Sequence, residues 1–179
     1  MRRLNGQNLV FLDESGCQSN ISRTRSWSKV GVPVTCLESP YRKKNITVMG
    51  AIRSSGPVAM RSQDRPMKKR DFETFIRRDV APRLKRGDVL VMDNLPSHRS
   101  QEARRQLHAR GVKVLFTPPY SPEFNPIEMV WSVMKSRLRK AKFEKRVTSV
   151  RYTIASVWRA LASISFERFI QACGYRLNS

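Results

Sequence analysis

The segment from Pro118 to Glu128 constrains the fold more than any other part of the sequence. The Pro118-Pro119 pair forces extended backbone and excludes a helix. A helix is then predicted to begin abruptly, because Asn125 suits the capping position and Pro126 suits the first helical position. Glu128 therefore lies in the first turn of a rigid helix. It serves there either as the capping-box partner of Asn125 or as a functional carboxylate.

Short apolar runs before this segment predict strands that lie inside a sheet. They occupy residues 9–12, 89–92 and 112–116. Two more runs, at 46–52 and 58–60, flank a Ser-Ser-Gly turn. The N-terminal part of the chain therefore predicts a meander of antiparallel strands.

Apolar residues recur at helical spacing in the remaining segments. We expect helices from Pro126 onward and at residues 71–84, 99–110, 149–162 and 166–172. Asp71 is the expected cap of the first helix, and Pro82 is expected to kink or end that helix near Val80. The order of elements predicts one α/β domain over residues 1–179. Its mixed central sheet combines antiparallel and parallel strands, with helices on both faces.

The charge balance indicates a polyanionic partner. The 179 residues include 35 Lys and Arg against 14 Asp and Glu, a net charge of +21. Such a fold repels itself, so nucleic acid is the first candidate partner and an acidic membrane surface the second. No run approaches the roughly 20 apolar residues that span a bilayer. Cys17, Cys36 and Cys173 are far apart and odd in number, which argues against a disulfide scaffold or a zinc site and favours a reducing cytoplasm.

Three carboxylates are predicted to converge on one edge of the sheet. Asp13 and Asp93 each follow a predicted interior strand, and Glu128 begins the helix after a third one. Ligands gather at the carboxyl ends of parallel strands. Clustered carboxylates repel each other unless a divalent cation neutralises them, and Mg²⁺ prefers such oxygen ligands. The pattern predicts two-metal displacement at a phosphodiester, although a single aspartate at a strand end is more often a turn residue.

Other polar residues flank this predicted site. Glu14 is expected to point away from Asp13, into solvent. His98 is expected at the edge of the loop after Asp93, either as a polar residue at the entry to a helix or as a contact to DNA or metal-bound water. The basic residues that we expect to contact DNA phosphates, rather than to form a solvated helix face, are Arg23, Arg25, Lys135, Arg137, Arg139, Lys140, Lys142, Lys145 and Arg146.

Three runs of sequence form a specific motif pattern. They extend from Phe11 to Gly16, from Val91 to His98, and from Phe116 to Glu128 with Trp131 just beyond. Together they resemble the DDE transposases, in particular the bacterial insertion-sequence relatives of mariner elements. Asp93 and Glu128 are separated by 34 residues (94–127), the spacing characteristic of this branch, and Cys173-Gly174-Tyr175 resembles the family's closing motif.

The resemblance implies an RNase H-like fold in which Asp13, Asp93 and Glu128 form a catalytic, metal-binding triad. It implies cleavage at transposon ends and joining of the freed 3′-hydroxyl to target DNA, with Mg²⁺ as the cofactor, Mn²⁺ as its substitute and two ions at the site. The implied partners are double-stranded DNA and a second copy of the chain bound to it. The implied location is the bacterial cytoplasm, in association with the nucleoid.

The front of the chain departs from the family pattern. Family members usually carry helix-turn-helix domains before the catalytic core, whereas about eight residues precede the first predicted strand here. We therefore expect the N-terminal DNA-binding domain to be absent. The chain is then either the catalytic half of a protein whose helix-turn-helix half is encoded separately, or a truncated remnant. The competing hypotheses are an RNase H-like nuclease without strand transfer and an inactive DNA-binding remnant.

Overall fold

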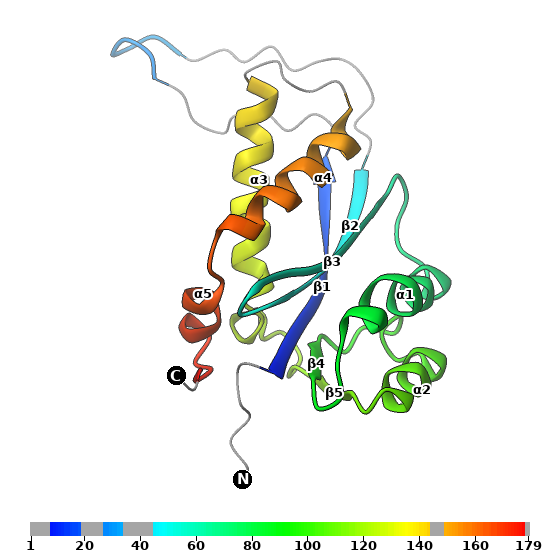
Figure 1. Cartoon of the computed structure of the whole chain (residues 1–179). Coiled ribbons are helices and arrows are strands. Elements are labelled where there is room, and N and C mark those ends of the chain that lie inside the picture. Colours follow the sequence, from blue (N-terminus) through cyan, green and yellow to red (C-terminus); the bar gives the residue numbers. More distant parts are fainter. Residues whose placement is uncertain (1–7, 19–26, 34–44, 144–148, 178–179) are drawn as a thin grey trace.

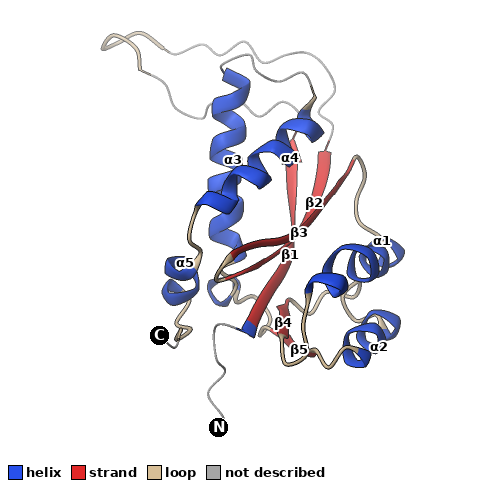
Figure 2. Ribbon diagram, viewed as in Figure 1, coloured by secondary structure: helices blue, strands red, loops and turns tan. Residues whose placement is uncertain are grey.

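The chain folds around a mixed sheet of five strands (Figures 1 and 2). A computed structural model describes residues 8–18, 27–33, 45–143 and 149–177. The strands lie in the order β3-β2-β1-β4-β5. Their bounds are β1 (Leu9–Gln18), β2 (Asn45–Arg53), β3 (Gly56–Gln63), β4 (Val89–Met92) and β5 (Lys113–Phe116).

Pairing of the strands makes β1 the centre of the sheet. The predicted meander is confirmed, since β1 pairs with β2 and β2 with β3 in antiparallel fashion. β4 and β5 add to the other side of β1 as parallel strands. Parallel neighbours need long crossovers, and helical segments precede each of these two strands. Because helices cover both faces of the sheet at its centre, residues 9–12 of β1 are fully buried.

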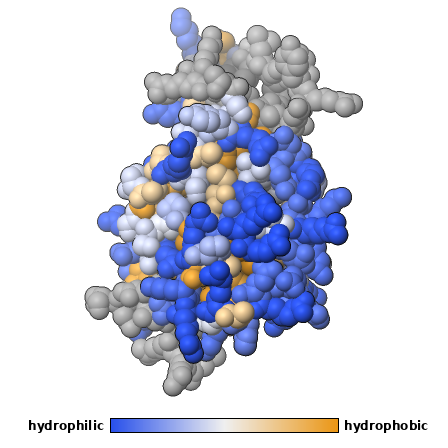
Figure 3. Space-filling view, turned by 45° about the vertical axis from the view of Figure 1, so that its right-hand side comes forward, coloured by the Kyte–Doolittle hydropathy of each residue, from blue (hydrophilic) through white to orange (hydrophobic). Residues whose placement is uncertain are grey.

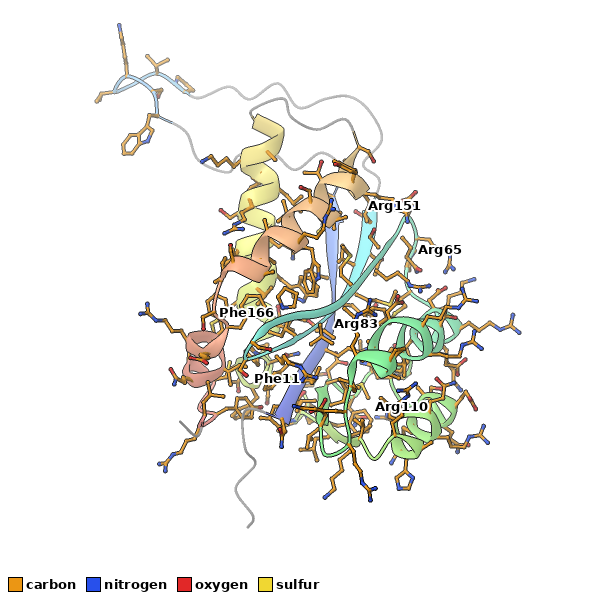
Figure 4. The ribbon with its side chains drawn as sticks, in the orientation of Figure 1. Phe11, Arg65, Arg83, Arg110, Arg151 and Phe166 are labelled. Atoms are coloured by element: carbon orange, nitrogen blue, oxygen red, sulfur yellow. The ribbon has the colours of Figure 1, made fainter. Side chains whose placement is uncertain are left out.

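Helices cover both faces of the sheet, as the sequence predicts (Figure 1). One face carries α1 (Lys69–Phe75) and α2 (Gln101–Ala109), and the other carries α3 (Ile127–Phe143), α4 (Val150–Ala160) and α5 (Glu167–Ala172). Side chains of β1 alternate between two apolar cores. Phe11 joins the core under α3, together with Phe166 (Figure 4), whereas Leu12 joins the core under α1.

Short helical turns interrupt the regular helices. α1 continues as a π-helical turn, η2 (Ile76–Val80), and a 3₁₀ turn, η3 (Ala81–Arg83), so the interruption expected around Pro82 is confirmed. Pro82 has no N–H to donate to a regular helix. Two further 3₁₀ turns are η4 (Pro122–Phe124) and η5 (Leu161–Ser163).

The predicted cap of α1 is wrong by three positions. Lys68 precedes the helix, and Asp71 lies inside its first turn. The Asp71 carboxylate accepts a hydrogen bond from the Lys68 backbone N–H at 2.9 Å and pairs with Arg65 at 2.6 Å. The hydrogen bond from Arg65 is the main reason that the pKa of Asp71 falls to about 2.

Two strand predictions also need correction. β1 does not end before Asp13 but continues to Gln18, because it goes on pairing with β2 after β4 has ended. β5 is an edge strand rather than an interior one, and Leu115 on it is 39 % exposed.

Among the helices described, none combines the length and the apolar composition needed to cross a bilayer.

Gly50 lets α3 approach the centre of the sheet closely. Gly50 of β2 lies opposite Asp13 of β1 in the antiparallel register. A Cβ atom at Gly50 would lie 2.5 Å from Cη2 of Trp131 and 3.0 Å from Cη2 of Trp158. The two indole rings lie 5.8 Å apart between their centroids. Absence of a side chain at Gly50 therefore leaves room for the Trp131 ring, whose Nε1 donates to Asp13.

We expect Gly50→Ala to destabilise the protein by about 1–3 kcal/mol, because the buried indoles cannot move without strain. Gly16→Ala on β1 is the matched control, since a Cβ atom there meets nothing within 4 Å. Urea denaturation of both variants measures the free energy of unfolding. Equal stability of the two variants would contradict the tight packing at Gly50.

Candidate active site

Asp13 is the buried centre of the site. The parallel register pairs Leu9 with Val89 and Phe11 with Val91. Extending this register by two residues places Asp13 level with Asp93. Asp13 is 8 % exposed and shares the α3 side of the sheet with Phe11. Its Oδ2 accepts a hydrogen bond from Trp131 Nε1 at 3.0 Å.

The electrostatics of Asp13 connect the three predicted triad residues. Burial, followed by the negative charges of Glu128 and Asp93, raises the pKa of Asp13 from 3.8 to about 7. Hydrogen bonds from the Glu14 backbone and from Trp131 oppose this shift. The negative charges of Glu128 and Asp93 therefore act on the Asp13 carboxylate, and the common site of all three stays a prediction.

Glu128 is presented by the first turn of α3 and is exposed. The capping-box alternative fails, because the Asn125 N–H donates to the Pro122 carbonyl at 2.9 Å rather than to Glu128. Asn125 contributes its backbone carbonyl, which accepts from the Glu128 N–H at 3.1 Å. The Asn125 Oδ1 atom is buried without a hydrogen-bond partner among the described residues, so its predicted side-chain cap is wrong. The Glu128 carboxylate therefore does not act as the capping-box partner of Asn125.

Asp93 belongs to a buried polar network that the sequence did not reveal. His98 is fully buried, with Nδ1 2.5 Å from Asp93 Oδ1 and Nε2 3.1 Å from Glu14 Oε1. Burial alone would lower the pKa of His98, but the hydrogen bonds and charges of Asp93 and Glu14 outweigh it and raise this pKa to about 9.

Two predictions are therefore wrong. Glu14 does point away from Asp13, but it contacts His98 instead of lying in solvent. His98 has no exposed surface with which to contact DNA. Two features of the sequence could have indicated this network. Strand alternation turns Glu14 to the face opposite Asp13, and His98 lies five residues after Asp93.

Tyr175 joins the segment before Glu128 to β1. Its hydroxyl donates to the Phe124 carbonyl at 2.8 Å, and its ring packs against Phe11 with the ring centroids 5.0 Å apart. Phe124 ends η4, three residues before α3 begins, and Phe11 lies two residues before Asp13. Tyr175 of the C-terminal Cys173-Gly174-Tyr175 motif thus connects the segment before Glu128 to the strand that carries Asp13.

We expect Tyr175→Phe to lower the free energy of unfolding by about 1 kcal/mol, because it removes one hydrogen bond and keeps the ring. Tyr152→Phe is the matched control, since Tyr152 is 66 % exposed. Chemical denaturation followed by tryptophan fluorescence compares the two. Similar stabilities would show that the Phe124 contact contributes nothing.

The predicted DNA contacts fall into three groups. Arg139 and Lys140 lie on α3 with exposed or half-buried side chains. Lys135 is half-buried, and its charge opposes the rise that burial causes in the pKa of the Cys17 thiol on β1. Arg137 donates to the Ala160 carbonyl at 3.3 Å. Four of the predicted contacts lie outside the described residues: Arg23, Arg25, Lys145 and Arg146. Lys142 belongs to a part of α3 whose side chains are not described.

A second set of basic side chains lies on the opposite side of the sheet. The side that carries α1 and α2 comes forward in Figure 3, where its surface is mostly hydrophilic. Exposed basic residues in these segments include Lys69, Arg70, Arg77, Arg78, Arg83, Arg104, Arg105 and Arg110. Arg83 and Arg110 are labelled in Figure 4.

The donor set suits a hard divalent cation, although it is not assembled. In the part of the chain that the structure describes, no group of three His, Cys, Asp or Glu side chains already stands close enough to hold an ion. Burial, and then the charges of Glu128 and Asp93, raise the pKa of Asp13, and a bound cation would offset that unfavourable negative charge. Asp13, Asp93 and Glu128 offer only oxygen ligands, which Mg²⁺ and Mn²⁺ accept.

The raised pKa of Asp13 makes the metal-free protein sensitive to pH. The unfolded chain releases this proton near 3.8 and the folded protein near 7, so the contribution of Asp13 to stability falls as pH rises between these values. Asp13→Asn lacks this titration. We expect its stability relative to wild type to rise across that window, by on the order of 4 kcal/mol at about 1.36 kcal/mol per pKa unit. Urea denaturation in chelator measures this difference, and a difference that is constant with pH would contradict it.

Comparison with solved structures defines the class of fold. The chain has an RNase H-like fold, because its mixed sheet with helices on both faces superposes on structures of that class. A Mos1 mariner paired-end complex with Mn aligns with a TM-score of 0.69 and 19 % identity, over 97 % of this chain and 53 % of that chain. A Mos1 strand transfer complex aligns with a TM-score of 0.59 and 17 % identity, over 97 % and 56 % of the two chains.

Sequence comparison defines the family. Residues 8–149 match the DDE superfamily endonuclease family, and the chain belongs to it. The Tc1 transposase of Caenorhabditis elegans is 35 % identical over 187 residues, which cover 95 % of this chain and 66 % of that protein. The Tcb2 transposase of Caenorhabditis briggsae is 27 % identical over 144 residues, or 74 % and 52 % of the two chains. The chain thus spans between about half and two thirds of these relatives.

Proposed function

We propose that the chain is the catalytic core of a transposase, which cleaves DNA at transposon ends and transfers the 3′-hydroxyl to target DNA. The observation that carries this proposal is the buried Asp13 carboxylate, whose pKa is raised first by burial and then by the charges of Glu128 and Asp93. Membership of the DDE superfamily endonuclease family and similarity to the Tc1 transposase support it. The proposed triad is Asp13, Asp93 and Glu128.

Divalent cations are part of the proposal. Two Mg²⁺ or Mn²⁺ ions held by the triad would activate the attacking water or 3′-hydroxyl and stabilise the leaving oxygen. Solved Mos1 complexes are described with Mn and with Mg, which supports these metals for the present chain. Trp131 orients Asp13 by donating to Oδ2, and the rigid first turn of α3 presents Glu128.

The proposed partner is double-stranded DNA at the transposon end and at the target. Lys135, Arg139 and Lys140 follow Glu128 along α3, so this helix extends positive charge away from the triad. Such cations position phosphates without reading sequence. The Mos1 complexes are described as paired-end complexes, which supports a homodimer on DNA. A separately encoded helix-turn-helix half would add recognition of the ends.

Origin and location complete the proposal. The motif resemblance supports a bacterial insertion sequence, with the protein acting at the nucleoid, whereas the curated relatives described above come from nematodes. The domain proposed is a single catalytic unit over residues 1–179.

The first test measures the thermal midpoint with Mn²⁺ alone. We expect Mn²⁺ to raise the wild-type midpoint, since a ligand at about 100 times its Kd stabilises the folded state by about 2.7 kcal/mol. Asp93→Asn relieves repulsion, so it should be at least as stable without metal and lose most of the response. Asp64→Asn is the matched control, because Asp64 is an exposed aspartate of the same domain. Equal responses in all three proteins would remove Asp93 from the site.

A second measurement separates the proposed reaction from its competitors. Supercoiled plasmid DNA is incubated with the protein and Mn²⁺, and nicked products and joined products are resolved on a denaturing gel. A transposase core gives strand joining that Glu128→Gln abolishes. Nicking without joining favours a nuclease of the same fold, and binding without either reaction favours an inactive remnant.

A further inference from the structure

We propose that Glu14 and His98 are positioning residues that hold the Asp93 carboxylate in the orientation in which it binds metal. This inference rests on the proposed function, because it assigns Asp93 as a ligand. It is carried by a chain of hydrogen bonds from Glu14 on β1, through the fully buried His98 ring, to the partly exposed Asp93.

Asp93 needs such support because secondary structure does not fix it. Asp13 is held inside β1, and Glu128 is held in the first turn of α3. Asp93 instead follows the last residue of β4, and its side chain is 38 % exposed. A carboxylate at the start of a loop has rotamer freedom, which ligand binding would have to remove. The contact with His98 removes that freedom in advance.

The His98 ring is held from three sides. Its nitrogens face Asp93 and Glu14, and the Phe72 ring of α1 packs against it with the centroids 4.7 Å apart. A carboxylate can only accept a hydrogen bond, so both ring nitrogens must donate. The His98 backbone N–H also donates to the Leu95 carbonyl at 2.9 Å, which closes the loop between them. The ring therefore has one orientation.

One oxygen of Asp93 remains for a ligand. Oδ1 accepts the hydrogen bond from His98, whereas Oδ2 accepts none from any described residue. This division is typical of metal-binding carboxylates, which are themselves held by hydrogen bonds. A buried His98 ring with two ionic partners is a poor way to gain stability alone, because well-packed apolar residues of similar size often stabilise a protein as much or more. The network therefore indicates a positioning role.

Asp13 and Glu14 are consecutive residues of β1 whose side chains lie on opposite faces of the sheet. Asp13 enters it from the α3 side, and Glu14 reaches it indirectly from the α1 side through His98. Glu14 and His98 are 84 residues apart in the sequence, so the contact links β1 to the loop after β4.

Substitutions at His98 can separate its two contacts. The amide nitrogen of asparagine takes the place of Nδ1, and that of glutamine takes the place of Nε2. His98→Asn therefore keeps a donor toward Asp93, whereas His98→Gln keeps only the donor toward Glu14. Glu14→Ala removes the far end of the network. Ser100→Ala is the control, since Ser100 is buried nearby and caps α2 but makes no contact with Asp93.

The experiment titrates the full-length chain and each variant with Mn²⁺ alone by calorimetry, and records the thermal midpoint of each. We expect His98→Gln and Glu14→Ala to weaken Mn²⁺ binding about tenfold or more, as loss of supporting hydrogen bonds at metal sites does. His98→Asn should stay within about threefold of wild type. Ser100→Ala should lower the midpoint and leave Mn²⁺ affinity unchanged.

The outcomes separate the inference from the proposed function. If the wild type binds Mn²⁺ and every His98 and Glu14 variant binds it equally well, the network is structural only and the inference is wrong. Equal weakening by His98→Asn and His98→Gln also contradicts it, because the Asp93 contact then has no special role. A wild type that takes up no Mn²⁺, alone or with duplex DNA, overturns the proposed function and the inference together.

Discussion

The hydrogen bond from Trp131 to Asp13 is the interaction on which the site depends. A carboxylate buried at the centre of the sheet is unfavourable, and burial is the main reason that the pKa of Asp13 reaches about 7. The indole N–H satisfies one oxygen, but it can reach Asp13 only because Gly50 leaves room for the ring. The same contact sets how closely α3 lies on β1. Because Glu128 lies one turn before Trp131 on α3, this distance also determines where Glu128 lies relative to Asp13.

Alternation along β1 distributes the polar groups between the two faces of the sheet. Asp13 faces the core under α3, and Glu14 faces the core under α1. Each is met there by a ring that carries a donor, Trp131 for Asp13 and His98 for Glu14. Both rings also belong to aromatic contacts, with Trp158 and Phe72. Apolar packing thus fixes the donors, and the donors fix the carboxylates.

Local pattern predicted the elements well and their partners poorly. The bounds of β4 could be read from the sequence, because a strand buried on both faces is a continuous apolar run. The end of β1 could not, because residues beyond Asp13 are polar or small and are held by long-range pairing with β2. For the same reason Glu14 was assigned to solvent. Its partner His98 is remote in sequence, and no local periodicity encodes that contact.

Charge is divided between a basic surface and an acidic centre. The chain carries a net charge of +21, yet the negative charges of Glu128 and Asp93 act on the buried Asp13 carboxylate. In the proposed function, a DNA phosphate drawn by the surface would be repelled by those carboxylates unless a cation lay between them. Bound metal therefore favours phosphate, and bound phosphate favours metal. Linkage requires the two effects to be equal, so one coupling free energy describes both.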